Sequence, residues 1–231
     1  MPIVAIVGPS GSGKSTGIFP NRDLGIIGLN PKETILCNVS GKPPAIRGWA
    51  SLYAGHPKDG GNLLVRPKAA DVVKAIEYAN TNMPHIKNIV VDDAQYLQAF
   101  EYARRTAEKG FDKFTDIFNE GFKPLYATFD IRDDLFVFFN YHDETDKQNS
   151  RKIKTCGQMI DNTITIEGLF TEVLYTEAQT DFKTKSTEYL FRTCTNGSDT
   201  CKSRVGVFPD KTIKNDYGLV KQFIEKYNKG E

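Results

Sequence analysis

The chain has 231 residues, and its 30 lysines and arginines nearly balance its 29 aspartates and glutamates, giving a formal net charge of +1. That length suits one α/β domain, and no linker rich in Pro, Gly or Ser divides it, so we expect a single domain over residues 1–231. The balanced charge excludes a generally basic surface, so any nucleic-acid partner would have to be bound by local loops.

The cysteines and the apolar runs exclude two further classes of protein. The four cysteines form no CxxC pair, so we expect reduced thiols and no zinc site. The first apolar run has five residues, which is too short for a signal peptide or a membrane span. We therefore expect a soluble cytoplasmic protein without a membrane partner.

Residues 8–16 read GPSGSGKST and follow the β-branched run Ile3–Val7 directly. This is the phosphate-binding loop pattern G-x-x-x-x-G-K-[ST] in its usual position behind a strand. Lys14 would reach the β- and γ-phosphate oxygens, and Ser15 would offer its hydroxyl to Mg²⁺. The alternative is a turn rich in Gly and Ser that happens to contain a lysine. The predicted nucleotide contacts are Gly8, Pro9, Ser10, Gly11, Ser12, Gly13, Lys14, Ser15 and Thr16.

The chain between the loop and residue 80 predicts two strands and two helices. Lys14 should open a short helix, because Pro20 follows within about two turns. Strands are expected at residues 33–39 and 63–65, and a helix at 69–80. The strand at 33–39 ends in Asn38 and Ser40 rather than in a carboxylate.

Residues 86–93 read IKNIVVDD, an apolar strand that ends in two carboxylates. This form is typical of the acid-bearing strand of phosphate-loop enzymes, with Asp92 holding the Mg²⁺ shell. Asp93 would face the γ-phosphate and act as the catalytic residue that orients water. The alternative is that the two aspartates only cap a helix beginning near Ala94.

Two helices and a buried strand are expected between residues 95 and 142. The first helix should run over 95–109 and stop at Gly110, and the second is rich in aromatic residues, with Gly121 and Pro124 expected to kink or divide it. The aromatic residues favour core packing, with a subunit interface as the alternative. The strand at 135–140 should bring Asn140 and His142 to the edge that holds the phosphate loop, where His142 is a candidate γ-phosphate sensor or else an ordinary polar strand end.

The last third of the chain carries the candidate nucleic-acid contacts. Residues 143–158 are polar and locally basic, which is typical of a mobile surface loop, and strands at 170–176 and 188–194 flank a polar tip before a final helix at 219–227. An aromatic ring among lysines can stack a base while the lysines meet phosphates. The candidate residues are Lys147, Arg151, Lys152, Lys154, Phe182, Lys183 and Lys185.

This order of strands and helices predicts a doubly wound, mainly parallel sheet with helices on both faces and an antiparallel C-terminal extension. The chain resembles the RecA-like branch of P-loop ATPases, and more closely the small bacteriophage AAA-type ATPases grouped with single-strand annealing recombinases. The segments that carry this resemblance are GPSGSGKST, DLGIIGLNPKETILCNVSGKPPAIRGW, NIVVDDAQYL, RKIKTCGQMID and YLFRTCTNGSDTCKSRVGVFPD.

The resemblance implies Mg²⁺-dependent ATP hydrolysis coupled to single-stranded DNA binding, in annealing, recombination or replication. It implies a homo-oligomeric ring or filament in the host cytoplasm, with a single-strand-binding protein as a further candidate partner. The strand after the phosphate loop supplies Asn38 where RecA-type enzymes have a water-activating glutamate, so Asp93 takes that role here. The finger that acts on a neighbouring subunit's nucleotide could be Lys152, Lys154, Lys202 or Arg204.

Three other functions share parts of this sequence pattern. Guanylate kinase-like enzymes also begin with GPSGxGKS, but no arginine-rich lid segment is present here to clamp two nucleotides. Transporter ATPase subunits share the loop as well, but the LSGGQ-like signature is absent. A helicase-loader type of nucleotide-binding module would bind nucleotide with little turnover.

Overall fold

The fold is built on an eight-stranded sheet of order β10-β9-β8-β1-β5-β4-β2-β3. The computed structural model describes residues 2–110, 112–155, 164–181, 183 and 185–231. The six strands β8, β1, β5, β4, β2 and β3 run parallel to one another. Strands β9 and β10 extend the sheet beyond β8 through antiparallel pairing. The predicted α/β class, the mainly parallel sheet and the antiparallel C-terminal extension are therefore confirmed. The strands of this sheet are β1 (Ile3–Val7), β2 (Thr34–Asn38), β3 (Leu63–Val65), β4 (Asn88–Asp92), β5 (Phe136–Tyr141), β8 (Glu172–Asp181), β9 (Ser186–Arg192) and β10 (Thr212–Lys214).

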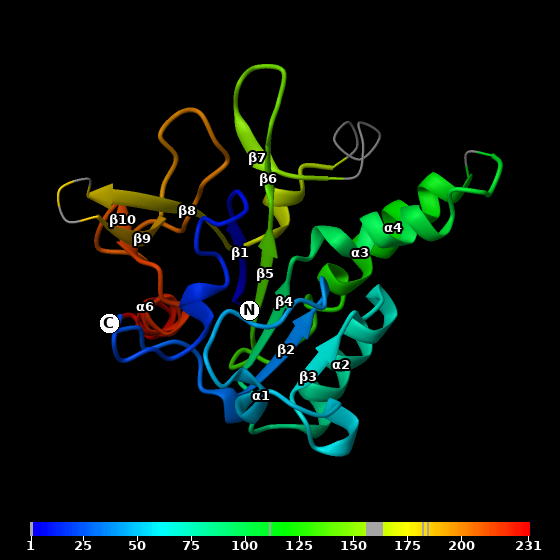
Figure 1. Ribbon diagram of the computed structural model, residues 1–231, viewed down its shortest axis with the longest axis horizontal. Coiled ribbons are helices and arrows are strands. Elements are labelled where there is room, and N and C mark those ends of the chain that lie inside the picture. The colour runs from blue at the N-terminus through cyan, green and yellow to red at the C-terminus, as the bar shows by residue number, and fades with distance from the viewer. Residues whose placement is uncertain (1, 111, 156–163, 182, 184) are drawn as a thin grey trace.

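Helices cover both faces of the sheet (Figure 1). Alternate residues of β1 face opposite ways: Ile3, Ala5 and Val7 join the core under one helical layer, and Val4 and Ile6 join the other core. Both β1 faces are fully buried, as expected for a central parallel strand. The first layer holds α2 (Ala69–Asn82), α3 (Gln95–Arg104) and α4 (Asp112–Tyr126), and the second holds α6 (Tyr217–Lys229). The shorter helices are α1 (Trp49–Leu52), η1 (Thr16–Ile18), η2 (Pro31–Glu33), η3 (Pro57–Asp59) and η4 (Ile166–Leu169).

The polar ends of three strands meet at one edge of the sheet. Strand β5 lies between β1 and β4, so the end of β5 stands between the phosphate loop and the paired acids. The Gly8 amide donates to the Tyr141 carbonyl at 3.1 Å, and the Ala94 amide donates to the Asn140 carbonyl at 2.8 Å. The sequence therefore placed Asn140 and His142 at the correct edge.

The helix expected to begin at Lys14 is absent, and only the single 3₁₀ turn η1 follows the loop. Carbonyl groups that would accept bonds within such a helix have other partners. The Tyr217 hydroxyl donates to the Lys14 carbonyl at 2.9 Å, and the Leu29 amide donates to the Ile18 carbonyl at 2.8 Å. Tertiary contacts therefore replace the local helix.

The two helices after the acids also differ from expectation. Helix α3 ends at Arg104 rather than at residue 109, and α4 runs undivided through Gly121 and Pro124. Gly121 is where α3 comes close, because a Cβ there would lie 2.2 Å from the Gln98 amide nitrogen. The glycine therefore serves helix packing and does not break the helix.

Residues 143–153, expected to be a mobile loop, form a two-stranded hairpin of β6 (Asp143–Thr145) and β7 (Arg151–Ile153). Ion pairs link the two strands: Arg151 contacts Asp143 at 2.8 Å, and Lys152 contacts Glu144 at 3.2 Å. Glu144 and Lys152 face each other across the hairpin and Asp143 and Arg151 are diagonal neighbours, and opposite charges at such positions stabilise a pair of strands. In the described part of the chain, no helix has both the length and the apolar character needed to span a membrane.

Candidate functional site

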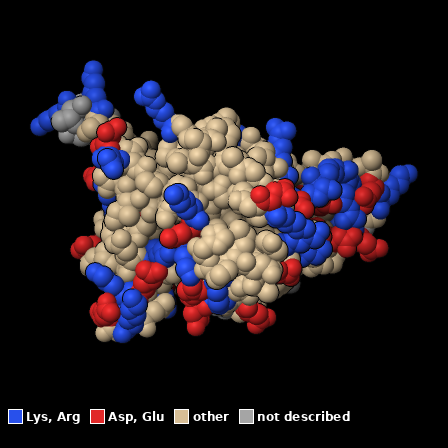
Figure 2. Space-filling model, turned by 90° about the horizontal axis from the view of Figure 1, so that it is seen from below, with Lys and Arg blue, Asp and Glu red and all other residues tan. Residues whose placement is uncertain are grey.

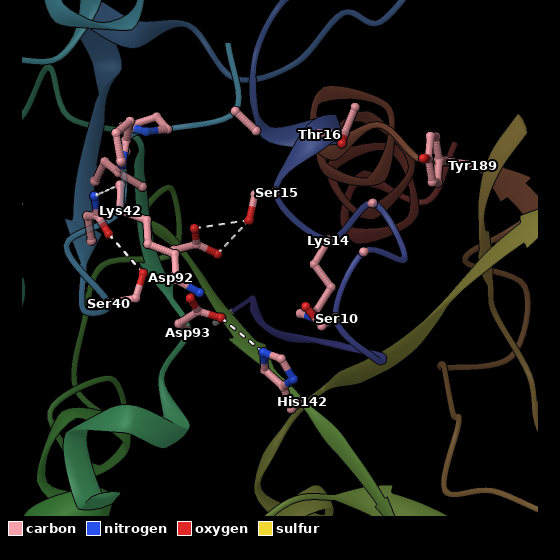
Figure 3. Close-up of a pocket in the computed structure, with 17 residues that line it drawn as sticks. Ser10, Lys14, Ser15, Thr16, Ser40, Lys42, Asp92, Asp93, His142 and Tyr189 are labelled. Atoms are coloured by element: carbon pink, nitrogen blue, oxygen red, sulfur yellow. Dashed lines mark hydrogen bonds and ion pairs between the residues drawn. The ribbon is translucent and has the colours of Figure 1, made fainter. Parts of the chain in front are cut away.

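A cleft of about 270 Å³ opens at the carboxyl ends of β1, β2 and β4 (Figure 3). Its walls are the phosphate loop, the loop that follows β2, the paired acids, His142 directly after β5, and Tyr189 from β9. This is the edge at which α/β sheets bind ligands, because loops rather than side-chain layers close it.

The backbone of the phosphate loop presents unused hydrogen-bond donors. Within the described chain, the N–H groups of Ser10, Gly11, Gly13, Lys14 and Ser15 donate to no protein atom, whereas Ser12 donates to the Pro9 carbonyl at 3.3 Å. Gly13 has a φ of +88°, and a Cβ there would lie 2.5 Å from the Tyr189 ring. A glycine is therefore required at this position, and the loop keeps a cluster of N–H groups suited to an anion.

Lys14 is folded back on its own loop. Its ammonium donates to the Gly8 carbonyl at 2.7 Å and to the Pro9 carbonyl at 2.8 Å, and the residue is only 7% exposed. Burial lowers the pKa of Lys14, and the charges of Asp93 and Asp92 oppose that shift. The Lys14 ammonium is therefore held against the backbone of its own loop.

Asp92 and Ser15 come together although they are 77 positions apart. The Ser15 hydroxyl lies 3.0 Å from each carboxylate oxygen of Asp92, and the Asn140 amide donates to that carboxylate at 2.7 Å. Burial raises the pKa of Asp92, and the neighbouring Asp93 raises it further, while the bonds from Asn140 and Ser15 lower it. A hydroxyl beside a buried carboxylate is an oxygen donor set that fits Mg²⁺, whose charge would offset that burial.

Asp93 points in a different direction from Asp92 and contacts His142. Its φ of +60° is rare outside glycine, and its carboxylate lies 3.3 Å from His142 Nε2. Burial and the charge of Lys14 lower the pKa of His142, and Asp93 opposes them, so the environment favours the neutral imidazole. Ala94 is the N-cap of α3 and neither aspartate side chain caps the helix, so the capping alternative for the pair is wrong.

Sequence reasoning missed several residues that shape the cleft. The Tyr217 hydroxyl, at the start of α6, lies 2.7 Å from the Asn140 amide oxygen and 2.9 Å from the Lys14 carbonyl. The Asn215 amide donates to the Gly13 carbonyl at 3.0 Å. No local pattern marks these residues, because their partners lie 77 to 203 positions away.

The basic candidates for nucleic-acid binding do not gather in the cleft. Arg151 and Lys152 pair with acids of their own hairpin, and Lys154 and Lys147 are exposed. Lys183 and Lys185 are exposed at the tip of the β8–β9 hairpin, and Phe182 lies outside the described residues. On the face seen in Figure 2, basic and acidic side chains are interspersed and no continuous basic surface forms among the described residues.

Two of the finger candidates lie at the other end of β8. The Arg204 guanidinium donates to Glu172 at 2.7 Å and stacks on Tyr227, and the Lys202 carbonyl accepts from the Val173 amide at 2.8 Å. Glu172 pairs with Val4, toward the amino end of β1, so these residues are remote from the chain's own phosphate loop.

The comparisons with known proteins add no family to this geometry. No protein-family model matches the chain, and no curated protein matches it.

Proposed function

We propose that this protein is a Mg²⁺-dependent ATPase of RecA-like type that binds single-stranded DNA and acts in phage recombination, annealing or replication. The observation that carries the proposal is the Ser15–Asp92 contact beside a loop in which five N–H groups donate to none of the described protein atoms. The fold brings a loop of phosphate-binding sequence and a distant acid together, and this proximity supports a site for Mg²⁺ and a nucleotide phosphate.

The chemistry assigns a separate task to each group. The loop amides would bind the β-phosphate, and Lys14 would exchange its own loop carbonyls for phosphate oxygens. Ser15 and Asp92 would hold Mg²⁺, which when bound neutralises charge on the β- and γ-phosphates. Asp93 would accept a hydrogen bond from the attacking water, and neutral His142 would hold the Asp93 carboxylate in place.

Hydrolysis is favoured over phosphoryl transfer to a second nucleotide by the position of Asp93. Its carboxylate and His142 occupy the part of the cleft next to Lys14, where a water is needed and an acceptor nucleotide would have to fit. The ring of Tyr189 stands at the other end, against Gly13, as a flat surface on which a base can stack.

A coupling route to single-stranded DNA is supported by chain connectivity. The β6–β7 hairpin begins directly after His142, and the Lys154 amide donates back to the His142 carbonyl at 2.9 Å. A strand bound at this hairpin would therefore move His142 relative to the γ-phosphate, and Lys183 and Lys185 would supply further contacts to the same strand. In a ring or filament these elements would line the DNA path.

Product analysis with three additions tests this function. ATP alone should yield ADP and phosphate, single-stranded DNA should raise the rate, and GMP should leave it unchanged. The double variant Lys183→Ala with Lys185→Ala should flatten the salt dependence of DNA binding. Each phosphate contact contributes about 0.7 to the slope of the logarithm of the binding constant against the logarithm of the salt concentration. Phosphoryl transfer to GMP would instead identify a kinase, and nucleotide binding without turnover would identify a loader-type module.

A further inference from the structure

The loop that follows β2 forms the wall of the cleft opposite the phosphate loop. Asn38, which is 5% exposed, shapes this loop from the end of the strand. Its amide nitrogen donates to the Lys42 carbonyl at 2.6 Å, and its amide oxygen accepts from the Gly41 amide at 3.0 Å and from the Ser40 hydroxyl at 3.4 Å. Asn38, at the strand end where RecA-type enzymes have an acid, therefore fixes the backbone around Lys42.

Two further features restrict this loop to one path. Gly41 has a φ of +70°, which favours glycine, and a Cβ there would lie 2.6 Å from the Arg66 side chain and displace it. Pro43 and Pro44 follow, which fixes their own φ angles and confines Lys42 to extended backbone. The Lys42 backbone therefore loses most of its conformational entropy on folding and not on ligand binding.

Lys42 reaches into the cleft from this loop. Figure 3 shows its side chain extending toward Asp92 and Asp93, on the side of the cleft opposite Lys14. The two cations are close enough that the charge of Lys42 adds to the effect of burial in lowering the pKa of Lys14. In the part of the chain that the structure describes, the Lys42 ammonium makes no ion pair, although two carboxylates line the same cleft.

We infer that Lys42 is a catalytic residue that binds the γ-phosphate in cis, from the same chain as the phosphate loop. This inference rests on the proposed ATPase function. It assigns Lys42 as the cation that contacts the γ-phosphate on the side opposite Lys14. A cation placed there stabilises the charge of the phosphoryl group in the transition state. Asn38 is then a positioning residue, which acts through the Lys42 backbone.

The step balances without a further reactant. The oxygen of water forms the new bond to the γ-phosphorus, and the bond from that phosphorus to the bridging oxygen breaks, with its electron pair leaving on ADP. The water proton passes by way of Asp93 to solvent. Lys42 keeps its protons and contributes charge alone.

Affinities for two nucleotides separate a γ-phosphate contact from a general effect on the site. For Lys42→Ala, the Kd of a non-hydrolysable ATP analogue should rise about tenfold or more, since a charged hydrogen bond is lost, while the Kd of ADP stays within about twofold. The turnover number should fall about 10²-fold to 10³-fold. Lys32→Ala is the matched control, because Lys32 is exposed at the opposite end of β2 and should change none of these values.

Mixing two inactive variants tests whether Lys42 acts in cis. In a mixture of Lys14→Ala and Lys42→Ala, a finger that acts in trans would be restored at some subunit boundaries, and activity would return. We expect no recovery. Recovery of activity, or an unchanged ratio of ATP-analogue to ADP affinity in Lys42→Ala, would overturn the inference while leaving the ATPase function standing. A parent protein that does not hydrolyse ATP would remove both.

Discussion

Asp92 and Asp93 are neighbours in the sequence but face different partners in the cleft. Asp92 is held between Ser15 and Asn140, whereas the left-handed backbone of Asp93 turns its carboxylate toward His142. Under the proposed function the two acids would therefore have different tasks, one at the metal and one at the attacking water.

Substituting each acid by its amide should separate these tasks. Asp92→Asn should weaken Mg²⁺-dependent nucleotide binding, because a neutral amide replaces the proposed metal ligand. Asp93→Asn should bind nucleotide normally and lose about 10²-fold to 10⁴-fold in turnover, the usual contribution of a general base. Asparagine also tolerates the positive φ at position 93, so the backbone should be retained. Titration of a fluorescent ATP analogue, with and without Mg²⁺, measures the first effect; equal binding defects in both variants would remove the catalytic role from Asp93.

Among the secondary structure elements, α6 has the most unexpected part in the site. The phosphate loop lacks the helix that usually supports it, and the start of α6 supports it instead. The Tyr217 hydroxyl contacts the Lys14 carbonyl and the Asn140 amide oxygen, both in the buried interior. This ties the loop to the strand end that orients Asp92.

Tyr217→Phe should therefore affect both stability and turnover. The substitution removes the one hydroxyl hydrogen that the Lys14 carbonyl and the Asn140 amide oxygen share, which should lower the free energy of unfolding by about 1–3 kcal/mol. Turnover should also fall, because the Asn140 amide is then free to rotate away from Asp92. Tyr227→Phe, at a 37% exposed position on the same helix, is the control. Urea denaturation that gave equal unfolding free energies for the parent and Tyr217→Phe would contradict this account.

The elements that the sequence predicted well are those with a strong local pattern. Apolar runs located β1, β2, β4 and β5, and the polar ends of these strands correctly placed the loop, the acids and His142 at one edge. The missing helix after Lys14 could not be predicted, because the contact that replaces it comes from Tyr217, 203 positions away. The β6–β7 hairpin escaped notice because its stabilising pairs are charged, and charged residues usually indicate a solvated loop.

At the scale of the whole molecule, every proposed function depends on one cleft formed by distant parts of the chain. Its lining comes from β2, β4 and β9, from the segments that follow β1, β2 and β4, and from His142 just after β5, so the fold itself assembles the site. The net charge of +1 and the interspersed charges on the face seen in Figure 2 give no general attraction for DNA, so we expect a DNA response, under the proposed function, to depend on local contacts at the hairpins.

The most direct test of the account is single-turnover hydrolysis of ATP by the parent protein and by Lys14→Ala, with Mg²⁺ and with Mg²⁺ removed by a chelator. The parent should release ADP and phosphate only with Mg²⁺. Lys14→Ala should keep the same circular dichroism spectrum and lose at least about 10²-fold in rate, since a preorganised charge at the transferred phosphate is removed. A Lys14→Ala variant that hydrolysed ATP at the parental rate would contradict the assignment of this cleft.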